Sequence, residues 1–225
     1  MSLLLEAYDQ LPARQSNDDP DLYRAGVGEA IEEFYDLVRE RYTEGTLGRM
    51  LTHHLDVRAR RAAAVALGLI GTFVSNSAVA QALKDDDDQV RGTAADALWD
   101  IWFRGDGGTQ GMELRRALAL PDVAERLPAL DDLSQKYPDF AEIYNQRAIQ
   151  HFGCGQYAKA VADCETALRY NPHHFGAAAG LGQCYLRMNK PGAAVRAFSQ
   201  ALDINPEMDS LRDVMNTLRG GKGEE

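Results

Sequence analysis

Residues 141–172, AEIYNQRAIQHFGCGQYAKAVADCETALRYNP, are repeated in outline by residues 175–206, FGAAAGLGQCYLRMNKPGAAVRAFSQALDINP. Six identities recur 34 positions apart: Ala160, Val161, Ala167, Leu168, Asn171 and Pro172 are matched by Ala194, Val195, Ala201, Leu202, Asn205 and Pro206. A fixed period of this length, with small residues and a closing Pro, is typical of helical repeat arrays. We therefore expect an all-α, helical-repeat superhelix.

A second and shorter period lies upstream of this stretch. Six residues recur 31 positions later: Arg60, Ala63, Ala64, Ala66, Leu67 and Ile70 are matched by Arg91, Ala94, Ala95, Ala97, Leu98 and Ile101. Paired alanines let helices approach closely, and Asp56 and Asp87 keep a fixed step from the arginines, so each turn can hydrogen-bond to its neighbour. The segments VRARRAAAVALGLIG and QVRGTAADALWDIW resemble short bacterial HEAT repeats, of the kind also seen in phycobilin lyases.

The 34-residue units resemble the tetratricopeptide repeat (TPR) family. The matching positions are Tyr144, Ala148, Ala160, Ala167 and Pro172 in the first copy, and Leu181, Gly182, Tyr185, Ala194, Phe198, Ala201 and Pro206 in the second. The first copy departs from the family pattern at Arg147, His151 and Cys164, where apolar or aromatic residues are usual. The order, HEAT-like and then TPR, is also similar to a group of bacterial proteins that combine both repeats.

These patterns predict five segments. We expect a loosely tethered N-terminal arm (1–27), HEAT-like repeats (28–106), a degenerate TPR-like adaptor (107–140), two TPR units with a capping helix (141–219) and a flexible tail (220–225). In the adaptor, Arg126 occupies a small-residue position and Pro128 is expected to interrupt the second helix. The helix at 90–104 is apolar on most sides, so we expect it to join both arrays into one continuous superhelix.

Composition limits the partners. The 225 residues carry a net charge of −10, of which residues 1–106 contribute −8. This balance disfavours nucleic acid and anionic membrane surfaces. The sequence contains no run of eighteen apolar residues, and its first ten residues lack the pattern of a signal peptide, so we expect neither a membrane span nor a secretory signal. The three cysteines lack metal-type spacing. We expect a cytoplasmic protein.

The TPR resemblance implies a binding surface. In such repeats the first helix of each pair lines a concave groove, suited to a peptide or helix of a partner protein. Helical phase predicts the groove residues Glu142, Asn145, Ile149 and Phe152 in the first layer, and Ala179, Gln183, Leu186 and Arg187 in the second. Alternatively, the N-terminal arm of this chain fills the groove.

One subset of the family clamps the C-terminal carboxylate of chaperones with Lys, Asn and Arg side chains. The corresponding positions here hold Asn145, Ile149, Gln183, Asp213 and Thr217. Because the paired cations are missing, the resemblance implies no chaperone-tail binding.

Catalytic and metal chemistry receive little support from the residues. The pairs His53–His54 and His173–His174 are adjacent, and adjacent histidines on a helix point about 100° apart instead of converging on one ion. Cys164 fits a small buried residue, Cys154 lies near a turn without an evident base, and Asp85–Asp88 fits an acidic helix cap. We therefore predict no enzyme, metal or cofactor. The alternatives are a bilin-type lyase or carrier of a prosthetic group, and a self-assembling structural module.

Overall fold

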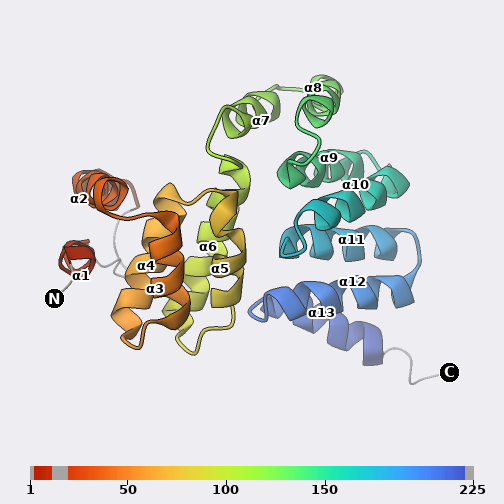
Figure 1. Cartoon of the computed structure of the whole chain (residues 1–225). Coiled ribbons are helices and arrows are strands. Elements are labelled where there is room, and N and C mark those ends of the chain that lie inside the picture. Colours follow the sequence, from red (N-terminus) through yellow and green to blue (C-terminus); the bar gives the residue numbers. More distant parts are fainter. Residues whose placement is uncertain (1–2, 12–19, 221–225) are drawn as a thin grey trace. The chain divides into compact units, whose positions relative to one another are not determined.

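The computed structural model describes residues 3–11 and 20–220, which form thirteen α-helices and one 3-10 turn without any β-strand. The predicted all-α helical-repeat fold is therefore confirmed. The chain divides into two compact units, residues 1–101 and 102–225 (Figure 1). The division falls inside one helix, three residues before its end. That the two arrays continue as one superhelix stays a prediction.

The first unit alternates longer and shorter helices. Its elements are α1 (Leu3–Tyr8), α2 (Pro20–Arg41), α3 (Glu44–His53), α4 (Val57–Ile70), η1 (Phe73–Ser75), α5 (Asn76–Ala82) and most of α6 (Asp88–Arg104). Thr43, Asp56 and Thr72 each stand before an element and accept a hydrogen bond from a backbone N–H at its start. Such side chains fix where a helix begins, because its first N–H groups have no partner within the helix.

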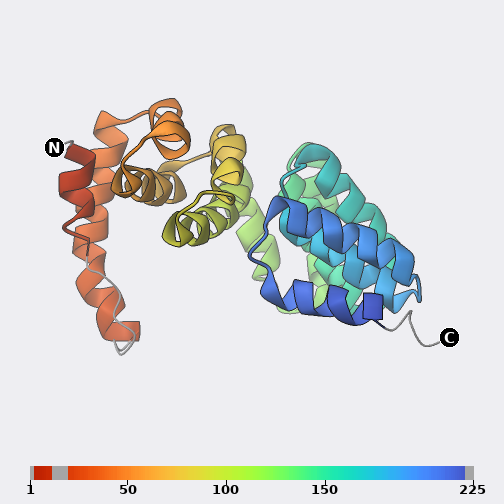
Figure 2. The same ribbon diagram turned by 90° about the horizontal axis from the view of Figure 1, so that it is seen from below.

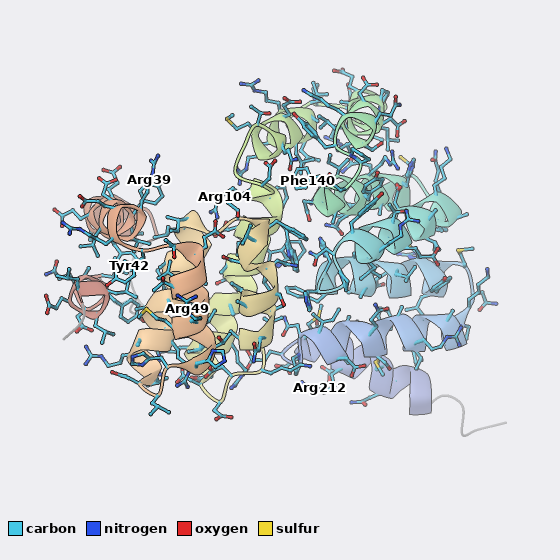
Figure 3. The ribbon with its side chains drawn as sticks, in the orientation of Figure 1. Arg39, Tyr42, Arg49, Arg104, Phe140 and Arg212 are labelled. Carbon is cyan, nitrogen blue, oxygen red and sulfur yellow. The ribbon has the colours of Figure 1, made fainter. Side chains whose placement is uncertain are left out.

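The first helix is packed against its unit, unlike the loosely tethered arm expected for residues 1–27. Leu4 is fully buried, Leu5 is 8% exposed, and α1 lies beside α2 in both views (Figures 1 and 2). Tyr42 reaches α1, where its hydroxyl accepts a hydrogen bond from the Leu4 backbone N–H at 3.1 Å (Figure 3). Helix α2 also begins at residue 20, earlier than the predicted boundary at 28. Residues 12–19 of the predicted arm lie outside the described residues.

Alanines and ion pairs hold the HEAT-like repeats together. Ala62 and the recurring Ala63, Ala64 and Ala66 on α4 are fully buried. Two of the four carboxylates in the acidic turn after α5 (residues 85–88) form ion pairs within the unit: Arg60 pairs with Asp85 at 2.8 Å and Arg61 with Asp87 at 2.5 Å. The Arg61 guanidinium lowers the pKa of the Asp87 carboxyl to about 2, and Asp87 also accepts from the Val90 N–H at the start of α6. The acidic turn thus caps α6, as its pattern indicates.

The second unit starts with the last turn of α6 and continues as a regular stack. Its elements are α7 (Gln110–Leu118), α8 (Val123–Lys136), α9 (Ala141–Gly153), α10 (Tyr157–Tyr170), α11 (Phe175–Arg187), α12 (Pro191–Ile204) and α13 (Asp209–Gly220). Figure 1 shows α9 to α13 layered in chain order. The predicted capping helix is α13, which buries Leu211 and Met215 against α12 and exposes its polar side.

The pair α7–α8 has a core of its own. Leu114 from α7, Leu130 and Leu133 from α8, and Phe140 and Ile143 from the start of α9 form one buried cluster. Helix α8 runs through Pro128, so the expectation that this residue interrupts it is wrong. The proline stands in the second turn of the helix, where only one N–H bond, to the carbonyl four residues earlier, is lost.

Candidate functional site

The first helices of the two TPR units, α9 and α11, expose a set of predicted groove residues. Ile149 is 52% exposed, and Gln183 and Arg187 are also exposed. Phe152, Ala179 and Leu186 are half-buried. We call the accessible surface formed by Ile149, Phe152, Gln183, Leu186 and Arg187 the α9–α11 face.

Aromatic contacts order one end of this face. The Arg187 guanidinium lies over the Phe152 ring, with 5.8 Å from its carbon to the ring centroid. Tyr157, in the first turn of α10, contacts the ring of Phe152 edge-on, and the two ring centroids lie 5.4 Å apart. Phe152 also packs against the buried cluster that includes Ala148 and Cys164. The face therefore presents a fixed aromatic ring and a cation beside the exposed Ile149 side chain.

Glu142 and Asn145, the other two predicted groove residues, lie in the interior instead. Glu142 is 1% exposed and Asn145 is 4% exposed. The Glu142 carboxylate accepts hydrogen bonds from the side-chain amides of Asn145 at 3.1 Å and Gln146 at 2.6 Å, and it contacts Nε2 of His174 at 2.8 Å. Helical phase placed them on the same side of α9 as Ile149, but α11 and its N-terminal cap cover this end of the helix. We therefore leave them out of the α9–α11 face.

His174 holds this interior network, whereas the sequence drew attention to it only as one of two adjacent histidines that were considered as metal ligands. Its Nδ1 accepts a hydrogen bond from the Ala177 N–H at 3.1 Å, so His174 caps α11. Because Nδ1 accepts a hydrogen bond, the ring proton lies on Nε2, and Nε2–H donates a hydrogen bond to the Glu142 carboxylate. The indole of Trp102 stacks on the imidazole, with centroids 4.0 Å apart. The residue is therefore a structural link between α6, α9 and α11.

The chaperone-clamp positions hold no lysine or arginine. Asn145 is buried, Ile149 and Gln183 are uncharged, and Asp213 and Thr217 on α13 are exposed. The Thr217 hydroxyl donates to the Asp213 carbonyl at 3.0 Å, within its own helix.

Two buried cysteines and one carboxylate in a hollow are held by neighbouring side chains of the protein itself. Cys164 and Cys184 are buried in one core cluster, where contact with the Cys184 thiol and burial raise the pKa of Cys164. A hollow of about 360 Å³ in the first unit contains one carboxylate, Glu44, which accepts from the Thr72 N–H, the Thr72 hydroxyl and the Ser75 hydroxyl. In residues 3–11 and 20–220, no three His, Cys, Asp or Glu side chains are grouped as metal ligands.

Two repeat families match different parts of the chain, and the matches fall on the segments with the 31-residue and the 34-residue repeat. A tetratricopeptide repeat family model matches residues 152–213, and a HEAT repeat model matches residues 10–99. A TPR repeat-containing protein of Rhizobium etli is 33% identical over 92 residues, which are 41% of this chain and 45% of that protein. The human SGT1 homolog is 36% identical over 90 residues, which are 39% of this chain and 25% of that protein. The chain thus spans less than half the length of the relatives it matches.

One solved structure, the first TPR of Spaghetti (RPAP3) bound to an HSP90 peptide, is similar at 15% identity with a TM-score of 0.47. The matched region covers 52% of this chain and 92% of the chain in that structure. No helix within the described ranges combines the length and the apolar content that crossing a membrane requires.

Taken together, the stacked helix pairs define an α-helical repeat protein. It carries HEAT repeats in its first part, followed by tetratricopeptide repeats.

Proposed function

We propose that the chain is a non-catalytic scaffold whose α9–α11 face binds a peptide or a helix of a partner protein. The exposed Ile149 carries this proposal, because it stands beside the ordered ring of Phe152 on a surface that is already formed. A preformed surface loses little conformational entropy on association, so a short segment can bind it.

The proposal does not involve a C-terminal carboxylate. The clamp positions offer Ile149, Gln183, Asp213 and Thr217, none of which is a cation. Binding should therefore rest on side-chain contacts along the segment, and an internal stretch of a partner should serve as well as a chain end.

The test is a selection of random 16-residue peptides, displayed with both ends fused, followed by titration of the selected sequences. Wild-type protein should yield peptides that bind saturably. The Ile149→Asp variant should bind them about tenfold more weakly, the effect of losing one apolar contact in a peptide interface.

Met112→Asp is the matched control, because Met112 on α7 is 54% exposed and lies outside the face. It should leave the affinity unchanged. Equal weakening by both variants, or an absence of saturable peptides, would show that the face is not the binding site.

A further inference from the structure

The second TPR layer is basic within an acidic protein. Residues 166–202 contain Arg169, Arg187, Lys190 and Arg196 and no Asp or Glu, whereas about one residue in seven of the whole chain is acidic. This basic stretch covers α11 and most of α12. Two of its four cations, Arg187 and Lys190, stand at the end of α11 and in the turn that follows.

Three other cations of the same unit are held by carboxylates. Lys136 pairs with Glu113 at 2.7 Å, Arg147 with Asp163 at 2.6 Å, and Arg212 with Asp209 at 2.6 Å. Arg187 and Lys190 are exposed and form no ion pair within the described ranges 3–11 and 20–220. The guanidinium of Arg187 lies over Phe152 instead, so its hydrogen-bond donors remain available to a ligand.

The position of Arg187 is also favourable for its own helix, because a cation in the last turn interacts with the C-terminal end of the helix dipole. That role needs no second cation and no aromatic neighbour. Because Arg187 lies over the Phe152 ring, a positive charge stands beside the aromatic part of the α9–α11 face.

We propose that this face selects an acidic protein segment. An apolar side chain of the segment packs on Ile149 and Phe152, and a neighbouring Asp or Glu pairs with Arg187 and Lys190. Charge complementarity of this kind sets partner choice and association rate. An acidic protein segment fits better than nucleic acid because its aliphatic side chains can pack on the exposed Ile149, whereas a phosphate backbone offers charge alone. The inference rests on the proposed function.

The experiment uses three fluorescein-labelled 15-residue peptides with identical leucines and isoleucines. Their remaining positions are rich in Glu, in Gln or in Lys, and binding to the full chain is followed by fluorescence polarisation. The Glu peptide should bind about fivefold to tenfold more tightly than the Gln peptide. Raising the salt concentration should remove this preference, because exposed charges are screened.

Charge reversal identifies the cations. The double variant Arg187→Glu with Lys190→Glu should favour the Lys peptide, and Arg187→Gln should lose most of the preference for Glu. Arg116→Glu, an exposed change of the same type on α7, should keep it. Thermal unfolding of each variant reports whether the helix-end role of Arg187 has also been disturbed.

The results of these titrations distinguish a failure of the acidic preference from a failure of peptide binding by the α9–α11 face. Binding that is equal for all three peptides and is weakened by Ile149→Asp would overturn the acidic preference alone. An absence of binding by every peptide would remove the proposed function. A labelled single-stranded oligonucleotide that binds more tightly than the Glu peptide, through Arg187 and Lys190, would overturn the choice of an acidic protein segment.

Discussion

Glu142 shows how one residue changes its role once the helices pack. By position on α9 it belongs beside Ile149, yet its carboxylate is buried and contacts Asn145, Gln146 and His174. A buried carboxylate is tolerated only when hydrogen bonds satisfy it, and removing it leaves its donors unpaired. The residue therefore stabilises the joint between two repeats instead of contacting a ligand.

We expect Glu142→Ala to lower the free energy of unfolding by about 2–4 kcal/mol, because buried donors lose their acceptor. Glu142→Gln keeps an acceptor oxygen and should cost less. Urea unfolding followed by circular dichroism measures both. Among molecules that remain folded, affinity for selected peptides should be unchanged. A stable Glu142→Ala protein with lost peptide binding would instead return Glu142 to the binding surface.

Three arginines make the same local contact with the backbone of the turn before their helix. Arg60, Arg91 and Arg126 each donate through Nη1 to the carbonyls six and five residues earlier, across the turn that precedes their helix. Arg126 additionally donates from Nε to the Gln150 side chain in α9 at 2.9 Å. The presence of Arg126 at a small-residue position of the TPR pattern thus has a physical reason. Helix α8 uses the turn-binding arginine of the HEAT-like repeats.

Helix packing explains why the two TPR copies differ at matching positions. In the second copy, Gly182 on α11 faces the ring of Phe198 on α12, and a Cβ at Gly182 would lie 2.3 Å from it. In the first copy, Ala148 on α9 shares a cluster with Cys164 on α10. A larger residue on the first helix is matched by a smaller one on the second, so both pairs fill their space. Cys164 is therefore a compensated departure from the family pattern.

Gly182→Ala should destabilise the protein by roughly 1–3 kcal/mol, the usual cost of overpacking a filled core. Gly192→Ala on α12 is the control, because a Cβ there meets nothing within 4 Å. That substitution should be neutral or slightly stabilising, since glycine is a poor helix former. Thermal unfolding distinguishes them, and equal midpoints would contradict the tight Gly182–Phe198 packing.

Across the whole molecule, α6 connects two differently built units. Its residues up to Ile101 belong to the first unit, and Trp102 belongs to the second, where it contacts His174 and Phe175. Trp102 is 2% exposed, so its indole contributes a large apolar surface to the core of the second unit. The second unit therefore depends on a residue from the HEAT-like end of the sequence.

A fragment of residues 88–225, which keeps all of α6, should fold and melt at a higher temperature than a fragment of residues 106–225. The shorter fragment lacks Trp102 and leaves one side of the buried His174 and Phe175 rings uncovered. Deleting a large buried aromatic side chain typically costs about 3–5 kcal/mol. Circular dichroism melts of both fragments measure the difference. Identical melting temperatures would mean that the stack does not need Trp102.

Local pattern was enough for much of this protein. The 34- and 31-residue periods predicted the helix pairs, the alanine-rich contacts and the repeat families, because each repeat packs mainly on its neighbours and short-range spacing carries the fold. Ile149, Gln183 and Arg187 were also placed correctly on the exposed side of their helices. Their role in binding stays a prediction.

Tertiary packing decided what periodicity could not distinguish. One side of α9 carries both the exposed Ile149 and the buried Glu142, because His174 covers only the beginning of the helix. Three further contacts likewise join residues far apart in sequence: Leu4 with Tyr42, Trp102 with His174, and Arg126 with Gln150. Helical phase gives a direction around one axis, whereas burial depends on which neighbouring element covers that direction.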